Sequence, residues 1–217
     1  MKAAQIKKYS KEIQVSVNEI PVPEPHEDEA LIKVMAAAVN PLEILQLTGS
    51  VRLIQDYKMP LTLGNECSGI VEKVGNNVKD FRTGDRVYAR LPIQKIGAFA
   101  EYVAVDHKAL AKMPSGYDFV TAAAIPLAGL TAYQGLVEEL EVEPGKSLLI
   151  TGASGSFGQI AVPIAKSMGL RVIVTGKFTF PRETDKVGSR PTYRLQGRKL
   201  LGGTDRHGLC NRHLGGK

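Results

Sequence analysis

The stretch SLLITGASGSFGQIAVPIAKSMGLRVIVTG, residues 147–176, decides the fold of this chain. A short apolar run at residues 148–150 ends in a glycine-rich turn, and apolar residues at helical spacing follow that turn. A second apolar run, residues 171–175, comes directly after Gly169 and Leu170. Runs of this kind are typical of buried parallel strands. The stretch therefore predicts a strand, a loop, a helix and a second strand, joined by a right-handed crossover.

Glycines in the turn indicate what this unit binds. Gly152, Gly155 and Gly158 have the spacing G-x-x-G-x-x-G, which lets the backbone turn tightly and approach a pyrophosphate at a helix N-terminus. The usual dinucleotide fingerprint is G-x-G-x-x-G, so a strand-to-helix turn of another α/β protein is the alternative interpretation. We favour dinucleotide binding because the glycines lie between a predicted strand and a predicted helix. The expected cofactor-binding residues of this unit are Gly152, Ala153, Ser154, Gly155, Ser156, Phe157, Gly158, Thr175 and Gly176.

The end of the second strand bears on the choice of dinucleotide. The strand ends in Thr175 and Gly176, with no acidic residue there. An Asp or Glu at this point accepts hydrogen bonds from the ribose 2′-hydroxyl of NAD and repels a 2′-phosphate. Its absence favours NADP(H).

Composition limits the class of protein. The 217 residues, 43% of them hydrophobic, suffice for one good core or two small ones. No apolar run approaches membrane-spanning length, and the amino terminus lacks the apolar core of a secretion signal. Cys67 and Cys210 do not make a disulfide framework. We therefore expect a cytoplasmic protein that does not contact a membrane.

Charge divides the chain at Gly176. The net charge is +6, but residues 177–217 contain ten Lys and Arg against three Asp and Glu, so this tail carries +7 and the rest −1. The tail has no helical or strand periodicity, which predicts a disordered basic extension. A basic tail also raises nucleic-acid binding as an alternative function, although no RNA-binding signature accompanies it and we consider this partner unfavoured.

Residues 1–117 predict a barrel-like or sandwich-like β domain, because short apolar segments alternate with turn formers. From residue 118 to residue 140 the composition shifts to Ala and Leu and predicts two helices, so we place the domain boundary near Tyr117. The predicted strands of the first part are residues 3–6, 13–17, 30–39, 69–74, 86–90 and 99–105.

Several motifs, in this order, resemble the medium-chain dehydrogenase/reductase superfamily: GNECSGIVEKVGNNVKDFRTGDRVYA (64–89), GAFAEYVAVD (97–106), AAAIPLAGLTAYQGL (122–136) and the glycine-rich unit. VNPLE (39–43) is similar to the Asn-Pro-x-Asp stretch of the zinc-free quinone oxidoreductase branch. The match covers residues 1–176. It implies an α+β fold, with a GroES-like β-barrel domain at 1–117, a truncated Rossmann α/β unit at 118–176, and NADPH in the cleft between them.

The resemblance also implies an activity, which is hydride transfer from NADPH to a quinone or to an activated alkene such as an enone or enal. Asn40 and Thr131 match positions that family members place near the nicotinamide, and Asn40 is the candidate catalytic residue. Asn40 would orient the carboxamide or the acceptor, not act as an acid or base. Two alternatives stay open: Asn40 caps a turn before a proline, and Thr131 bonds back to its own helix.

The same resemblance predicts no zinc. Zinc-dependent relatives have a Cys within the stretch that matches residues 36–40 and a His where this chain has Asn65. Neither ligand is present, and we expect Glu66 to be a buried or paired carboxylate. In the tail, His207, Cys210 and His213 have ligand-like spacing, but the surrounding sequence offers no fold to hold them.

The tail departs from the family at Lys177, and we interpret it as the product of a +1 frameshift near Gly176. Back-translated and read one nucleotide later, the tail can encode family-like segments such as LGAD and VIDTLG. A chain cut off in this way is expected to be impaired or inactive, and the homodimer of full-length relatives cannot be assumed for it. A non-enzymatic NADPH-binding fragment is then the alternative function.

Overall fold

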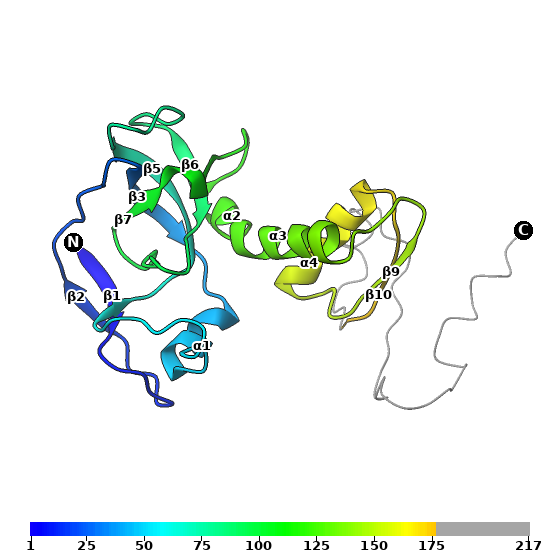
Figure 1. Cartoon of the computed structure of the whole chain (residues 1–217), viewed down its shortest axis with the longest axis horizontal. Helices are drawn as coiled ribbons and strands as arrows, with labels where there is room; N and C mark the ends of the chain where they lie inside the picture. Colours follow the sequence, from blue (N-terminus) through cyan, green and yellow to red (C-terminus); the bar gives the residue numbers. More distant parts are fainter. Residues whose placement is uncertain (177–217) are drawn as a thin grey trace, which may run out of the picture. The chain divides into compact units, whose positions relative to one another are not determined.

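The computed structural model describes residues 1–176 of the chain, which form two compact units, Met1–Leu127 and a second unit that begins at Ala128 (Figure 1). The predictions made for the tail, including its disorder, its shifted reading frame and its His and Cys spacing, lie outside the described residues. The mixture of helices and sheets confirms the α+β class. Within residues 1–176, none of the helices has the length and apolar character needed to cross a membrane.

The first unit is built mainly from antiparallel strands. One sheet has the strand order β2-β1-β4 and the other has the order β7-β3-β5-β6-β8. The elements of this unit are β1 (Lys2–Ile6), β2 (Ser16–Glu19), β3 (Glu29–Ala37), α1 (Pro41–Thr48), β4 (Leu61–Thr62), β5 (Glu66–Val74), β6 (Arg86–Arg90), β7 (Tyr102–Asp106), η1 (His107–Ala109), β8 (Leu110–Lys112) and α2 (Phe119–Ala123).

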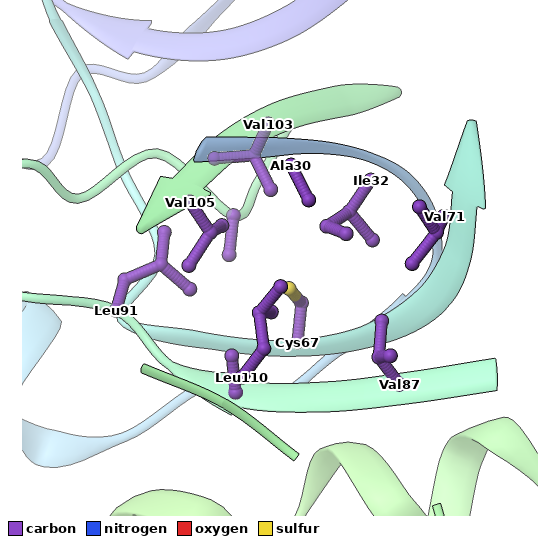
Figure 2. Packing of buried hydrophobic residues seen from close by; sticks show 11 residues of the cluster. Ala30, Ile32, Cys67, Val71, Val87, Leu91, Val103, Val105 and Leu110 are labelled. Carbon is purple, nitrogen blue, oxygen red and sulfur yellow. The ribbon is translucent and has the colours of Figure 1, made fainter. Parts of the chain in front are cut away.

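The core of the first unit lies on the inner face of the five-stranded sheet. Figure 2 shows side chains from several strands meeting there, among them Ile32 of β3, Val71 of β5, Val87 of β6 and Val105 of β7, and each of these is at most 2% exposed. Alternation along each strand sends every second side chain to this face. Burial of these apolar side chains holds β5 and its neighbours in place, and β5 begins with Glu66.

The first unit runs past Tyr117, where the sequence predicts the domain boundary, and it includes α2. The small residues Ala122 and Ala123 of α2 are buried. The hydroxyl of Ser68 on β5 donates a hydrogen bond to the carbonyl of Phe119, at 2.5 Å. A helix whose small residues are buried and whose first carbonyl is bonded to β5 packs as part of the β unit.

The second unit contains the predicted strand–helix–strand arrangement. Strands β9 (Ser147–Ile150) and β10 (Arg171–Val174) pair in parallel, and α4 (Ser156–Ser167) connects them. Before them come α3 (Pro126–Tyr133), whose first two residues belong to the first unit, and the π-helical segment η2 (Gln134–Glu139). The parallel pairing predicted from residues 147–176 is thus confirmed.

Of the strands predicted in the first unit, only residues 86–90 have the observed bounds. The strands predicted at residues 3–6, 69–74 and 99–105 lie at Lys2–Ile6, Glu66–Val74 and Tyr102–Asp106, and the remaining two differ as well. The strand predicted at residues 13–17 lies at Ser16–Glu19, where it pairs with β1. The strand predicted at residues 30–39 ends at Ala37, because α1 begins shortly afterwards at Pro41. The chain therefore leaves β3 and enters a helix just where Asn40 stands.

Candidate functional site

The glycine turn between β9 and α4 depends on a backbone conformation that glycine tolerates best. Gly152 has φ +69°, in the left-handed region that L side chains rarely adopt. The N–H of Ala153 donates to the carbonyl of Thr175, at 2.8 Å, and the N–H of Thr175 donates to the carbonyl of Ile150, at 3.0 Å. These bonds tie the turn to the end of β10 and bring predicted site residues from both ends of the stretch together.

Gly158 is required for a different reason, which is space. A Cβ atom built on Gly158 would lie 2.3 Å from the Cα of Ala153 and 2.7 Å from its carbonyl carbon. The first turn of α4 therefore packs directly on the backbone of the loop. This close approach leaves no room for a side chain and holds the start of the helix beside the turn.

The N-terminus of α4 supplies donors for an anionic group. Gly155 is the N-cap residue, and the N–H of Gln159 donates to the carbonyl of Gly155, at 2.9 Å. The N–H groups of residues 156–158 precede this first intrahelical bond, so they have no partner within the helix. Together with the helix dipole, such N–H groups favour phosphate. Ser156 and Phe157 are exposed.

The remaining predicted cofactor residues lie in the same unit. Ala153 is buried, Ser154 is half-buried, and Thr175 and Gly176 are half-buried at the end of β10. Thr131 is an exposed residue of α3. The arrangement brings the turn and the end of β10 together, while the role of each residue toward a cofactor stays a prediction.

Asn40, which belongs to the first unit, is the N-cap residue of α1 and is half-buried. Its backbone N–H donates to Oε2 of Glu43, at 2.6 Å, and the N–H of Glu43 donates to the carbonyl of Asn40, at 3.1 Å. Its side-chain Nδ2 donates to Oε1 of Glu66, at 2.7 Å. Asn40 therefore caps a helix, where the alternative interpretation expects a turn, and its carboxamide is held by a buried carboxylate.

Glu66 is a buried carboxylate, as the sequence predicts, and is 1% exposed. Its Oε1 accepts from Asn40, and its Oε2 accepts from the backbone N–H of Leu127, at 2.7 Å. Burial raises the pKa of Glu66 above its usual value; the two hydrogen bonds counteract this only in part. The negative charge of nearby Glu43 raises the pKa of Glu66 further. The positive charge of Arg90, which pairs with Glu66 across strands β5 and β6, lowers it.

Polar side chains on the buried face of α1 form a hydrogen-bond network with neighbouring residues. Asn65 donates from Nδ2 to Oε1 of Glu43, at 2.6 Å, and to Oε1 of Gln46, at 2.9 Å. Gln46 donates from Nε2 to Oδ1 of Asn65 and to the hydroxyl of Tyr57, both at 3.0 Å. Among residues 1–176, no buried side-chain nitrogen or oxygen lacks a hydrogen-bond partner. The network therefore holds α1, and with it Asn40, rigidly beside the start of β5.

Sequence reasoning did not single out Glu43 and Gln46 as part of the site. A signal was present: Asn40 is followed by Pro41 at the first helical position and Glu43 three residues after the cap. This is a known pattern for a helix start, in which the acidic side chain reaches back to the cap N–H.

Within residues 1–176, no group of three or more His, Cys, Asp or Glu side chains is placed to hold a metal ion. A cavity of about 340 Å³ contains none of the predicted site residues; it is lined by Gln5, Lys7, Asn18, Met59 and Pro60.

Comparison with known proteins finds a matching family model and several similar oxidoreductases. Residues 26–115 match the family model of the alcohol dehydrogenase GroES-like domain. The chain is 41% identical over 153 residues to an NADPH-dependent alkenal/one oxidoreductase, chloroplastic, of Arabidopsis thaliana, covering 68% of this chain and 39% of the relative. It is 40% identical over 159 residues to a quinone oxidoreductase of Pongo abelii, covering 73% of this chain and 47% of the relative.

Among solved structures, the quinone oxidoreductase of Escherichia coli complexed with NADPH aligns with a TM-score of 0.78 at 27% identity. The alignment covers 93% of this chain and 60% of that structure. The chain spans less than half the length of the two curated relatives. The GroES-like domain, the parallel strand–helix–strand unit and these relatives agree with the sequence motifs, and the chain belongs to the medium-chain dehydrogenase/reductase superfamily, in its quinone oxidoreductase-like branch.

Proposed function

We propose that this chain carries the nucleotide-binding turn and the substrate-side residues of an NADPH-dependent oxidoreductase acting on quinones or activated alkenes such as enones and enals. The observation that carries the proposal is the glycine turn, with its positive φ at Gly152 and no space for a Cβ at Gly158. The names of the relatives, which include NADPH, quinone and alkenal, support the cofactor and the class of acceptor.

The turn fits a dinucleotide in three respects. Its backbone can approach a ligand because Gly152 and Gly155 carry no side chain. The first N–H groups of α4 have no acceptor within the helix, and such groups favour a pyrophosphate at this end of the helix. No acidic residue follows β10 within the described part of the chain, which leaves room for the 2′-phosphate of NADP(H). When bound, NADPH would supply the hydride.

Asn40 would position the reacting groups in the first unit. Its Nδ2 carries two hydrogens, of which one goes to Glu66. The second hydrogen and Oδ1 are then a donor and an acceptor for a carboxamide or for the oxygen of a quinone or enal. A hydrogen-bond donor at that oxygen stabilises the negative charge that develops during hydride transfer. The carboxamide does not ionise, so Asn40 exchanges no proton.

We further propose that this chemistry is independent of zinc. The amide of Asn65, at the position where the zinc-dependent relatives would have His, is fully engaged with Glu43 and Gln46. The carboxylate of Glu66 is engaged with Asn40 and Leu127. These groups serve as internal hydrogen-bond partners, which supports a role in fixing Asn40 over a role as metal ligands.

Titration of the 217-residue chain with NADPH and with NADH, followed by nucleotide fluorescence, tests this proposal. We expect NADPH to bind more tightly than NADH. Ser156→Asp places a carboxylate where the phosphates would lie, so it should weaken NADPH binding about tenfold or more while leaving the helix intact. Ser156→Ala is the matched control, and it should bind within a few-fold of the wild type. Equal affinity of all three proteins would refute the nucleotide site.

Turnover separates the enzyme from a non-enzymatic nucleotide-binding protein. NADPH consumption is measured with a naphthoquinone and with a medium-length enal. Consumption that falls in Asn40→Ala supports the oxidoreductase. Tight NADPH binding without consumption of either acceptor favours the non-enzymatic alternative.

A further inference from the structure

Glu66 connects two segments that are far apart in the sequence. Its Oε1 accepts from the carboxamide of Asn40 before α1, and its Oε2 accepts from the backbone N–H of Leu127 in α3. Both bonds are 2.7 Å long, the length of a strong charge-assisted hydrogen bond. One buried carboxylate therefore fixes a candidate catalytic side chain and the first turn of a helix at once.

The carboxylate also determines which way the Asn40 carboxamide points. An ionised carboxylate only accepts hydrogen bonds, so the NH₂ group of Asn40 must face Glu66 and Oδ1 must point elsewhere. The NH₂ and oxygen ends of the amide have nearly the same shape, so without this partner their shape alone would not decide which end faces position 66. Glu66 thus fixes the orientation of the Asn40 amide, and with it the directions of Oδ1 and of the second N–H.

We propose that Glu66 is a positioning residue, whose carboxylate sets the orientation of the Asn40 carboxamide for hydride transfer and anchors the start of α3. The proposal rests on the proposed function for its catalytic part. Its structural part, the orientation of Asn40 by Glu66, is independent of whether the chain turns over.

The surroundings of Glu66 fit this role better than a role in stability. A carboxylate that is 1% exposed is unfavourable unless it is well paired. Among the described residues Glu66 has no direct ion pair; the charged groups that influence it are Glu43 on α1, which disfavours its ionisation, and Arg90 on β6, which favours it. Buried ionisable groups with shifted pKa values and specific partners are characteristic of functional sites.

An isosteric change isolates the carboxylate. In Glu66→Gln the side chain keeps its size but offers one acceptor and one donor, so it can satisfy only one of the two N–H groups. Glu29→Gln is a matched control: Glu29 is also largely buried, and its carboxylate accepts from Lys95 and from the backbone N–H of His26. These partners of Glu29 differ from Asn40 and Leu127, which are the partners of Glu66.

Nuclear magnetic resonance of the ¹⁵N-labelled 217-residue chain reads the orientation directly. The side-chain NH₂ signals of Asn40, assigned by their loss in Asn40→Ser, and the backbone N–H signal of Leu127 are compared in the three proteins. We expect at least one of the two reporters to move strongly in Glu66→Gln and both to stay in place in Glu29→Gln. Unchanged reporters in a folded Glu66→Gln protein would overturn the proposal whether or not the chain has activity.

Kinetics tests the catalytic part where the wild type turns over. We expect Glu66→Gln to lower kcat about 10- to 100-fold with little change in the KM for NADPH, and Asn40→Ala to add little further loss in that background. A kcat equal to that of the wild type, with the Asn40 signals displaced, would show that Glu66 holds structure only. If the wild type shows no hydride transfer, the proposed function fails, and the Asn40 and Leu127 signals alone decide the orientation claim.

Discussion

Gly158 on the first turn of α4 lies against the backbone of Ala153, so closely that a Cβ atom on Gly158 would come within 2.3 Å of the Cα of Ala153. This contact holds the N-terminus of the helix over the glycine turn. The donors for a phosphate depend on it, because they are the N–H groups of the turn and of the first helical residues.

We predict that Gly158→Ala weakens NADPH binding about tenfold or more and lowers the free energy of unfolding of the second unit by about 1–3 kcal/mol, since the methyl group must push the helix away from the loop. Gly135→Ala is the control, because a Cβ there meets nothing within 4 Å. Fluorescence titration and thermal unfolding measure the two effects. Equal behaviour of the two variants would contradict the packing argument.

The preference for NADPH over NADH is expected to reverse in Thr175→Asp. Thr175 follows β10, and its backbone is already bonded to Ala153 and Ile150, so only the side chain changes. A carboxylate at this point accepts hydrogen bonds from the ribose hydroxyls of NADH and repels the 2′-phosphate. We expect the ratio of the two affinities to change about tenfold or more, measured by competitive titration. Thr175→Asn has the same shape without the charge, and it should leave the ratio largely unchanged.

The pH dependence of stability should carry a signature of Glu66. Because burial raises the pKa of Glu66, its protonated form stabilises the fold. This contribution is fully present below the unfolded pKa and is lost as the pH rises through the folded pKa. The unfolding free energy of the wild type should therefore gain on that of Glu66→Gln as the pH falls through this window. Urea unfolding, followed by amide signals of β5 at several pH values, measures the difference.

Glu29 provides a comparison of opposite sign. Although its burial acts to raise the pKa, the hydrogen bonds from Lys95 and His26 hold the pKa of Glu29 below its usual value. Its contribution is present above the unfolded pKa and is lost as the pH falls through the folded pKa. The wild type should therefore lose its advantage over Glu29→Gln in acid. Parallel pH curves for all three proteins would contradict both assignments.

The core of the five-stranded sheet should respond strongly to truncation. Ile32 is 1% exposed and packs among the side chains seen in Figure 2, so Ile32→Ala should lower the free energy of unfolding by about 2–5 kcal/mol. Val17 on β2 is 71% exposed, and Val17→Ala should change it by no more than about 0.5 kcal/mol. Urea unfolding compares the two. A loss of similar size in both variants would argue against this core.

Local sequence patterns were sufficient for much of the fold. Strand β6 has the predicted bounds, Arg86–Arg90, because turn formers end the apolar alternation on its N-terminal side. The βαβ unit was predictable because its strands, its glycine turn and its helix follow one another without interruption. In each case neighbouring residues carry the information.

Long-range contacts were not predictable in this way. The bond between Asn40 and Glu66 joins residues 26 positions apart, and its existence depends on how β5 is placed beside α1. Helix α1 is not recognisable from an apolar face, because its burial pattern is largely inverted and Leu47 is the only apolar residue among those that it buries. Glu43 and Gln46 are buried, whereas the apolar side chains of Ile44 and Leu45 are 45% and 44% exposed.

That inverted polarity constrains the order of folding. An eight-residue helix is marginal in water by itself, and of the buried residues of α1 only Leu47 packs in an apolar cluster, whereas Glu43 and Gln46 depend on hydrogen bonds. Asn65, which donates to Glu43, lies 22 residues further along the chain. The loop between the two residues must therefore close before their hydrogen bond can stabilise the helix. Helix α1 is therefore expected to form late, after β5 has docked, and Asn40 acquires a fixed place only in the last steps of folding.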